Sequence, residues 1–406
     1  MEIETLLELI ELIFAKKISQ ETFLEIVSNG NSNIFYLKYL IEHGIIPPDR
    51  ALIAATRTNQ VEVVRLLLDN GIKNMKPSFV LASNRDYFEI VDLLVKRGAK
   101  PTLQSDRFLQ EFSKASYKGR LDVVQLLLEN GVDPTINDNI SAASEGGHLE
   151  IVKSLLEYGV NPRTDNDSPI QTASNEGHID VVRLLIEKGA YVIANNNQAI
   201  KDASESGHLE VVRLLLEHGG DPNAAIVFAS KGCKLDVVQL LLEHRADVTA
   251  ERNESIHWAS LKNCIDIVRL LLNNGADPTA GNNYPIKAAS ENGHIEVVRL
   301  LLDNDSKYKV DPTDEDNYAI RTASAMGHLE VVQLLLDNGA DPTDDDNQAI
   351  KRASQRGHLE VVRLLLNNNS KYKADPTAQD NYAIKNASGD DKLEIIKLLE
   401  EYGASL

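Results

Sequence analysis

The sequence has little of what marks several classes of protein. It holds only two cysteines in 406 residues, too few for a disulfide framework, which suits a reducing intracellular compartment. No run approaches the roughly 18 apolar residues that a membrane span needs. Residues 1–14 carry four glutamates among their leucines and lack the basic start of a signal peptide. We therefore predict an intracellular protein of the cytoplasm, or of the host cytoplasm if its source is a virus.

Positive charge is also scarce. Lysine and arginine total 42 against 61 aspartates and glutamates, which gives a formal net charge of -19. Such a surface repels phosphate backbones and anionic lipid headgroups, so we expect neither nucleic acid nor membrane as a partner. Long linkers rich in glycine, serine or proline are absent as well, which favours one extended architecture over separate domains.

One short pattern is abundant. Residues 327–343, GHLEVVQLLLDNGADPT, recur in close copies along most of the chain, often at steps of 30 residues. Aligning the copies on the position of His328 marks thirteen units, of which the first three are divergent. The aligned positions are Asn33, Gln60, Tyr87, Arg120, His148, His178, His208, Lys234, Cys264, His294, His328, His358 and Lys392.

One copy predicts two helices. Residues 317–324 read as a short first helix with Asn317 as its N-cap, and residues 329–337 as a second helix with a narrow polar stripe. Gly339 suits the left-handed residue that ends the second helix, and Pro342 prevents its continuation.

A second helix that is apolar on most sides cannot be covered by one unit of about thirty residues, so adjacent units must stack and share a core. The predicted fold is an all-α solenoid of stacked helix-turn-helix units with short projecting turns, in one curved array. Residues 1–30 would form an N-terminal helical cap with a helix at 20–27, and residues 31–406 the array, whose last unit is a C-terminal cap.

The order of Gly-His, Leu-Glu-Val-Val, Leu-Leu and Gly-Ala-Asp in these copies resembles the ankyrin repeat, over roughly residues 31–406. The copies depart from that family in their period, mostly 30 where 33 is usual, and in the Thr-Pro-Leu-His opening of the first helix, which here reads Tyr-Ala-Ile-Arg or Gln-Ala-Ile-Lys. This shortened style is similar to ankyrin proteins of giant DNA viruses of amoebae. The resemblance implies a protein partner bound on a concave face of first helices and turn tips.

The resemblance also implies that the two residues before each Gly-His are exposed on that face, which adds Met326 and Arg356 to the candidate site. The regular pattern fails most in residues 221–265, where Phe228 and Trp258 occupy one repeat position in successive units. These aromatic side chains would either anchor a partner or fill space left by a shortened turn, and their exposure decides between the two. The candidate residues in this central region are Phe228, Lys231, His257, Trp258, Leu261 and Lys262.

The repeated histidines could suggest a metal site and the two cysteines a disulfide, but we expect neither. Six of the aligned positions carry a histidine, one in each of their units, and units about 10 Å apart cannot bring these side chains to one zinc ion, so we assign them to the repeat frame. Cys233 and Cys264 lie in adjacent units at near-equivalent positions, so we expect their Cα atoms to exceed the roughly 7 Å limit of a disulfide. No nucleophile, phosphate-binding or kinase motif is present, and we predict no enzyme and no cofactor.

Charged residues fall into three groups. The acidic turns lack the ligand spacing of a calcium loop and read as solvated tips that could together attract a basic partner. We expect the base that follows the first-helix isoleucine to pair with an acid of an adjacent turn. We expect the charged stripe of the second helices to form weak ion pairs. The turn acids are Asp314, Glu315, Asp316, Asp344, Asp345 and Asp346, and the bases are Lys201, Lys287, Arg321, Lys351 and Lys385.

Two functions follow from these patterns. The first is a non-enzymatic, monomeric scaffold that binds a partner protein on its first-helix face and turn tips. The alternative is a substrate-recruiting adaptor of a ubiquitin ligase or another host-directed enzyme complex, with residues 1–30 as its docking element.

Overall fold

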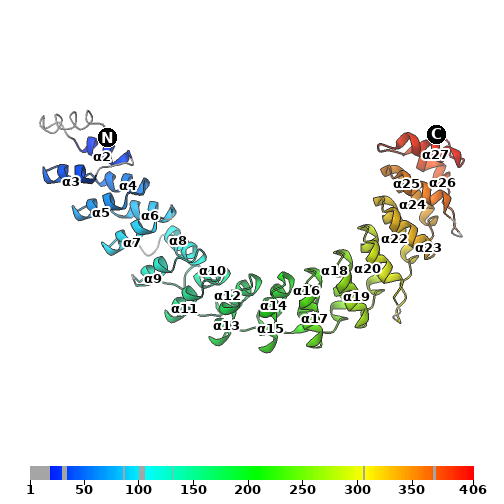
Figure 1. The fold of residues 1–406 in the computed structure, drawn as a ribbon, viewed down its shortest axis with the longest axis horizontal. Helices are drawn as coiled ribbons and strands as arrows, with labels where there is room; N and C mark the ends of the chain where they lie inside the picture. The colour runs from blue at the N-terminus through cyan, green and yellow to red at the C-terminus, as the bar shows by residue number, and fades with distance from the viewer. Residues whose placement is uncertain are drawn as a thin grey trace. The chain divides into compact units, whose positions relative to one another are not determined.

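A computed structural model describes the chain over residues 19–29, 34–85, 87–99, 106–129, 131–304, 307–368 and 372–406 (Figure 1). Every regular element in these ranges is a helix, and the ranges contain no strand. The predicted all-α class is therefore confirmed. The chain divides into two compact units, Met1–Ala173 with Glu187–Ala190 and Ser174–Ile186 with Tyr191–Leu406, and both consist of the same helix pairs.

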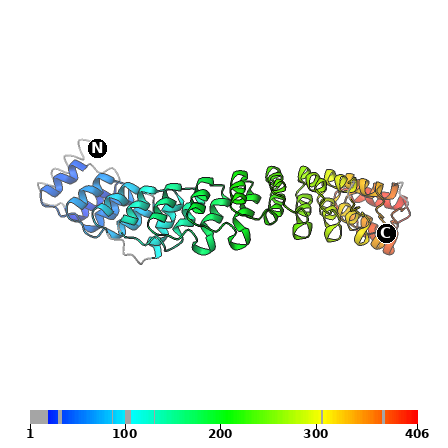
Figure 2. The ribbon, with the colours of Figure 1, turned by 90° about the horizontal axis from the view of Figure 1, so that it is seen from below.

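Two series of helices alternate along the chain, and within each compact unit they form two layers (Figures 1 and 2). The first helices are α4 (Asp49–Arg57), α6 (Lys76–Asn84), α8 (Asp106–Tyr117), α10 (Asn139–Glu145), α12 (Thr164–Asn175), α14 (Ala194–Ser206), α16 (Pro222–Lys231), α18 (Ala250–Leu261), α20 (Ala280–Glu291), α22 (Asp314–Met326), α24 (Asp344–Arg356) and α26 (Ala378–Lys385). The second helices are α3 (Ile34–Glu42), α5 (Val61–Asp69), α7 (Phe88–Lys96), α9 (Leu121–Glu129), α11 (Leu149–Glu157), α13 (Ile179–Glu187), α15 (Leu209–Glu217), α17 (Leu235–Glu243), α19 (Ile265–Asn273), α21 (Ile295–Leu302), α23 (Leu329–Asp337), α25 (Leu359–Asn367) and α27 (Lys392–Glu401).

The N-terminal helix α2 (Gln20–Ser28) packs against α4. Its bounds include the whole of the helix predicted at residues 20–27. Ser19 is its N-cap, since the Ser19 side chain accepts a hydrogen bond from the Thr22 backbone N–H at 3.3 Å. The earlier part of the predicted cap, residues 1–18, lies outside the described residues.

The core lies between the two layers and between neighbouring units. In α23, Val331, Val332 and Leu335 are buried against the first helices, while Gln333 and Asp337 face solvent. Neighbouring first helices pack on one another, as α20 does on α22 and α22 on α24. Stacking therefore covers the apolar second helices, as the repeat pattern requires.

The start of the first helices differs from the prediction. Asn317 is not an N-cap: it is the last of three left-handed residues, with φ of 57°, that follow Asp314. Its Oδ1 accepts the backbone N–H of Asp341 in the following unit at 2.6 Å. The same bond recurs from Asp221 to Asn197, Asp247 to Asn223, Asp277 to Asn253, Asp375 to Asn347 and Ser405 to Asn381.

The reason for the difference is that asparagine tolerates the left-handed region and can also bond across units, which a local cap does not require. The turn that contains Asp341 is closed by bonds of its own. Asp341 Oδ1 accepts both the backbone N–H and the Oγ1 hydroxyl of Thr343, at 2.8 and 2.6 Å. Gly339, as predicted, is left-handed with φ of 93° and follows the end of α23.

The repeated histidines belong to the frame, as predicted. In five of them the Nε2 atom lies within hydrogen-bond distance of a backbone carbonyl in the preceding unit, as in His358 with Ala325 at 3.0 Å. Further pairs are His148 with Tyr117, His208 with Asn175, His294 with Leu261 and His328 with Glu291. The histidine ring also packs on the glycine of the preceding unit: a Cβ added at Gly327 would lie 2.6 Å from Nδ1 of His358.

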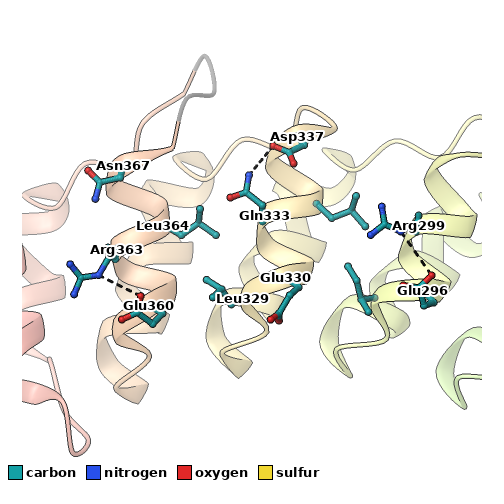
Figure 3. Close-up of a pocket in the computed structure, with 12 residues that line it drawn as sticks. Glu296, Arg299, Leu329, Glu330, Gln333, Asp337, Glu360, Arg363, Leu364 and Asn367 are labelled. Carbon is teal, nitrogen blue, oxygen red and sulfur yellow. Dashed lines mark hydrogen bonds and ion pairs between the residues drawn. The ribbon is translucent and has the colours of Figure 1, made fainter.

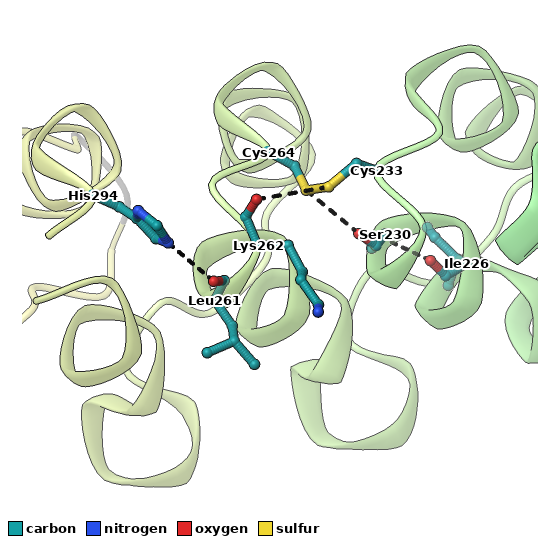
Figure 4. Close-up of a disulfide and its surroundings, with 7 residues drawn as sticks. All are labelled: Ile226, Ser230, Cys233, Leu261, Lys262, Cys264 and His294. Carbon is teal, nitrogen blue, oxygen red and sulfur yellow. Dashed lines mark hydrogen bonds between the residues drawn. A yellow bond between two sulfur atoms is a disulfide. The ribbon is translucent and has the colours of Figure 1, made fainter. Parts of the chain in front are cut away.

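The prediction that Cys233 and Cys264 cannot pair is wrong. They form a disulfide with a Cα–Cα separation of 5.5 Å (Figure 4). The two positions are not equivalent: Cys233 occupies the glycine position of its unit and Cys264 the histidine position of the next. These are the two positions that touch at the regular interfaces, so the disulfide replaces the contact between glycine and histidine.

Candidate functional site

The candidate site lies on the solvent side of the first helices. In three first helices, a side chain projects from this side two residues after the buried isoleucine: Phe228 follows Ile226 in α16, Trp258 follows Ile256 in α18, and Arg352 occupies the same position in α24. Phe228 and Trp258 are half-buried and Arg352 is exposed. Both aromatic rings thus pack on the array and keep part of their surface accessible.

Phe228 and Trp258 are joined by a lysine. The Lys231 Nζ lies 5.9 Å from the centroid of the Phe228 ring and 5.6 Å from that of Trp258, within range of a cation-π contact with each. It also pairs with Glu205 at 2.9 Å. The predicted residues Phe228, Lys231 and Trp258 therefore form one group.

His257 extends this group to the next unit. Its ring stacks on Trp258 with centroids 5.4 Å apart and meets the edge of Tyr284 at 4.3 Å. Burial lowers the pKa of His257, and Glu254 opposes that effect, so the imidazole is neutral at pH 7. We name Phe228, Lys231, His257, Trp258 and Tyr284 the aromatic row.

Sequence reasoning missed Tyr284 and the contact of Lys201. Tyr284 is 51% exposed, and its repeat position also carries Tyr318 and Tyr382, a recurrence that could have signalled an aromatic surface. The predicted pairing of Lys201 with a turn acid is wrong, because its Nζ lies 5.4 Å from the Phe228 centroid, where the ring of the next unit replaces the acid.

Met326 and Arg356 line a pocket of about 250 Å³ on the same side, between α22 and α24. Arg356 Nη1 donates to the backbone oxygen of Ala325 at 3.2 Å and contacts Met326 Sδ at 3.0 Å. Arg352 donates from Nε to Gln348 Oε1 at 3.2 Å. We name this site the arginine pocket. Its remaining lining residues are Glu291, Tyr318, Arg321 and Thr322.

Leu261 and Lys262, the remaining central candidates, lie beside the disulfide (Figure 4). The backbone oxygen of Leu261 accepts the His294 ring bond at 3.1 Å, and the backbone oxygen of Lys262 lies 3.9 Å from Cys233 Sγ. Their backbones thus belong to the frame, while the Lys262 side chain is exposed and the Leu261 side chain is half-buried.

Of the bases that follow the first-helix isoleucine, two pair with acids of the next turn, as predicted. Lys287 Nζ lies 3.2 Å from Asp314 and 2.9 Å from Glu315, and Arg321 pairs with Asp345. The hydrogen bond from Lys287 lowers the pKa of Glu315. Lys385 also pairs, at 2.7 Å, but with Asp380 of its own turn.

The pairing predicted for Lys351 is wrong. Its side chain is 2% exposed, and within the described structure its Nζ has no hydrogen-bond partner. Burial lowers the pKa of Lys351, against the opposing effect of Asp346 and Asp345. The Tyr382 ring, with its centroid 5.7 Å from Nζ, occupies the neighbouring space. Asp345 pairs with Arg321, whose side chain is longer, and not with Lys351.

The acidic turns are largely engaged within the chain. Asp344 accepts from Asn317 Nδ2 at 2.6 Å, and Asp346 accepts from Gln379 Nε2 at 2.9 Å. Asp316 is exposed. These bonds compete with a partner for the acids, so the turns offer a weaker acidic surface than their composition indicates.

The described residues contain no group of three or more His, Cys, Asp or Glu side chains placed to hold a metal ion. Nor does any helix among them combine the length and apolar character that crossing a bilayer requires.

The sequence model of the family described as ankyrin repeats (3 copies) matches residues 140–226, 222–282 and 280–346, which together cover more than half of the chain. The single ankyrin repeat matches residues 114–139 and 349–381. The chain therefore belongs to the ankyrin-repeat family, whose members are typically non-enzymatic binding modules. No curated protein matches the chain.

Proposed function

We propose that this chain is a non-enzymatic scaffold that binds a partner protein on the solvent side of its first helices. Ankyrin repeats support protein binding as the general role. The observation that carries the finer proposal is the aromatic row, because tryptophan and tyrosine that are held in place yet accessible are enriched at the anchors of protein interfaces.

The arginine pocket supplies the second contact of the proposed surface. Its arginine side chains form a basic site in a chain whose net charge is -19, and Met326 beside them is 41% exposed. Arginine binds carboxylates through two parallel hydrogen bonds. We therefore propose a partner with an apolar side chain over Phe228 and Trp258 and an acidic one at Arg352 and Arg356. The acidic turns remain a secondary proposal, with Asp316 as the accessible acid for a basic partner.

Affinity purification with quantitative mass spectrometry tests this function. The Trp258→Ala variant should lose the partner that wild type retains, and the purified pair should bind at least about tenfold more weakly, the loss expected for an interface anchor. Arg213→Ala, on the outer side of α15, is the matched control and should retain the partner. Equal recovery by wild type, Trp258→Ala and an Arg352→Glu/Arg356→Glu variant would place the partner elsewhere.

The adaptor function rests on residues 1–30 alone. Of these, α2 packs against α4, which supports a capping role for this helix. We also propose the cytoplasm as the compartment because the chain has only two cysteines, and their disulfide is then one of the few that cytosolic proteins keep. The likeness to giant-virus proteins rests on repeat style.

A further inference from the structure

The outer side of the array carries a groove that the proposed function does not use. It has a volume of about 780 Å³ and crosses the second helices α21, α23 and α25 (Figure 3). That volume lies within the range of sites that bind ligands. Leu329 and Leu364 point into the space between α23 and α25, and Ile295 and Leu334 add to the apolar lining.

These apolar side chains are not needed to hold α23 in the core. Val331, Val332 and Leu335 already supply its buried face, whereas Leu329 and Leu334 are half-buried. The equivalent of Leu334 in α17, Leu240, is only 3% exposed. A run of accessible apolar side chains across three helices marks a surface for interaction.

The charges around the groove are unequal. Glu296 pairs with Arg299 at 3.9 Å in α21, and Glu360 pairs with Arg363 at 3.5 Å in α25, as predicted for the outer stripe. In α23, Gln333 replaces the arginine.

Gln333 donates to Asp337 at 2.8 Å, and the described structure gives Glu330 no ion pair. The centre of the groove therefore carries the uncompensated charges of Glu330 and Asp337, between two helices whose acids are neutralised.

We propose that this groove binds a basic amphipathic helix of a protein partner. Leucine-like side chains at i, i+3 and i+4 spacing would enter the apolar spaces between the second helices, and lysine or arginine beside them would pair with Glu330 and Asp337. The acids disfavour phosphate backbones and anionic lipids as occupants. This second interaction surface is independent of the aromatic row.

A synthetic amphipathic helix of leucine and lysine, about 18 residues or five turns long, is the probe. Its fluorescence anisotropy is titrated with the full chain at low salt, next to a counterpart in which glutamate replaces every lysine. The lysine peptide should bind at least about tenfold more tightly, because both central charges favour it. Equal binding of the two peptides would overturn the proposal.

Gln333→Arg tests the site and not merely the net charge. The new arginine can pair with Glu330 at i, i+3 spacing, so the helix should stay folded while the affinity for the lysine peptide falls about fivefold. The matched control is Gln239→Arg in α17, where Asp236 and Gln239 repeat the local sequence outside the groove lining. An equal loss in both variants would show that the attraction belongs to the whole acidic surface and contradict the groove.

The apolar half of the proposal has its own pair of variants. Leu364→Gln should weaken binding of the lysine peptide about tenfold, as expected for an anchor position, whereas Leu184→Gln on α13 should not. Thermal melting of each variant checks that the chain is folded. Trp258→Ala should leave peptide binding unchanged, so failure of the groove and failure of the proposed function are distinguishable.

Discussion

The central units and the C-terminal units make the same contacts with different chemistry. Between α22 and α24, Gly327 packs on His358, and the histidine reaches a backbone carbonyl at 3.0 Å. At the corresponding place in the centre, Cys233 and Cys264 are covalently joined. The frame thus requires two positions in close approach but not a particular chemistry to join them.

A second difference accompanies the first. In the C-terminal units, Lys287 and Arg321 tie the first-helix corner to the acids of the next turn, whereas the central units carry Val227 and His257 at that position. The central first helices are held by a disulfide and by ring contacts, and their solvent side presents the aromatic row. Variants that break the disulfide should change how stability depends on redox state. Variants that break the ion pairs should change how stability depends on pH.

The largest expected effect is loss of the disulfide. The Cys233→Ser/Cys264→Ser variant should lose about 3 kcal/mol of unfolding free energy in urea, because the bond closes a loop across a sequence separation of 31 residues. Dithiothreitol should weaken wild type by a similar amount and leave the variant unchanged. A wild type that is indifferent to dithiothreitol, with two titratable thiols, would show that the central interface is also non-covalent.

The contact between Gly327 and His358 should give a smaller effect. Gly327→Ala adds a Cβ at 2.6 Å from the His358 ring on a backbone with φ of 81°, so we expect a loss of about 2 kcal/mol. Gly339→Ala is the matched control, since Gly339 has a similar φ of 93° but no atom within 4 Å of the added Cβ. It should cost only the backbone strain, about 1 kcal/mol. Equal urea midpoints for the two variants would remove the histidine contact from the explanation.

The smallest effect concerns pH. Bonds from Lys287 hold the pKa of Glu315 below its ordinary value of 4.5, so this contribution to stability is present above that pH and is lost as pH falls through the folded pKa. The melting temperature of Lys287→Met should therefore depend less on pH below about 4.5 than that of wild type. Lys351→Met, at the same repeat position but without a bonded acid, should leave that dependence unchanged. If the melting temperatures of wild type and Lys287→Met changed equally as the pH falls below about 4.5, this would refute the contribution of the contact between Lys287 and Glu315.

The repetition made most of the fold predictable. Apolar residues at helical spacing in 329–337, a left-handed glycine at 339 and a proline at 342 specify a helix and its end from local chemistry alone. The structural role of the histidines also followed, because one ligand per unit cannot converge on a metal. The family resemblance indicated a common surface for Met326 and Arg356.

Where prediction failed, the cause was a contact between units. The prediction for Cys233 and Cys264 rests on the spacing of equivalent positions, but their positions are offset by one residue and abut across the interface. Lys351 carries the same residue type as Lys287, yet the turn that follows it has Ala378 and Gln379 at the positions of Asp314 and Glu315, so no acid is offered there. Beside Lys201 the neighbouring contact is the Phe228 ring of the next unit. Asn317 resembles a local cap because its bond to Asp341 is not visible from one unit.

The sequence by itself determined that this chain is a stack of helix pairs, since the apolar second helices leave no other way to bury their surface. The tertiary structure decided which side chains meet across the units: the disulfide, the aromatic row, the arginine pocket and the unpaired acids of the outer groove. The physical reason is that periodicity dictates the direction of each side chain from its own helix. The partner it reaches depends on the length and charge of a side chain about thirty residues away.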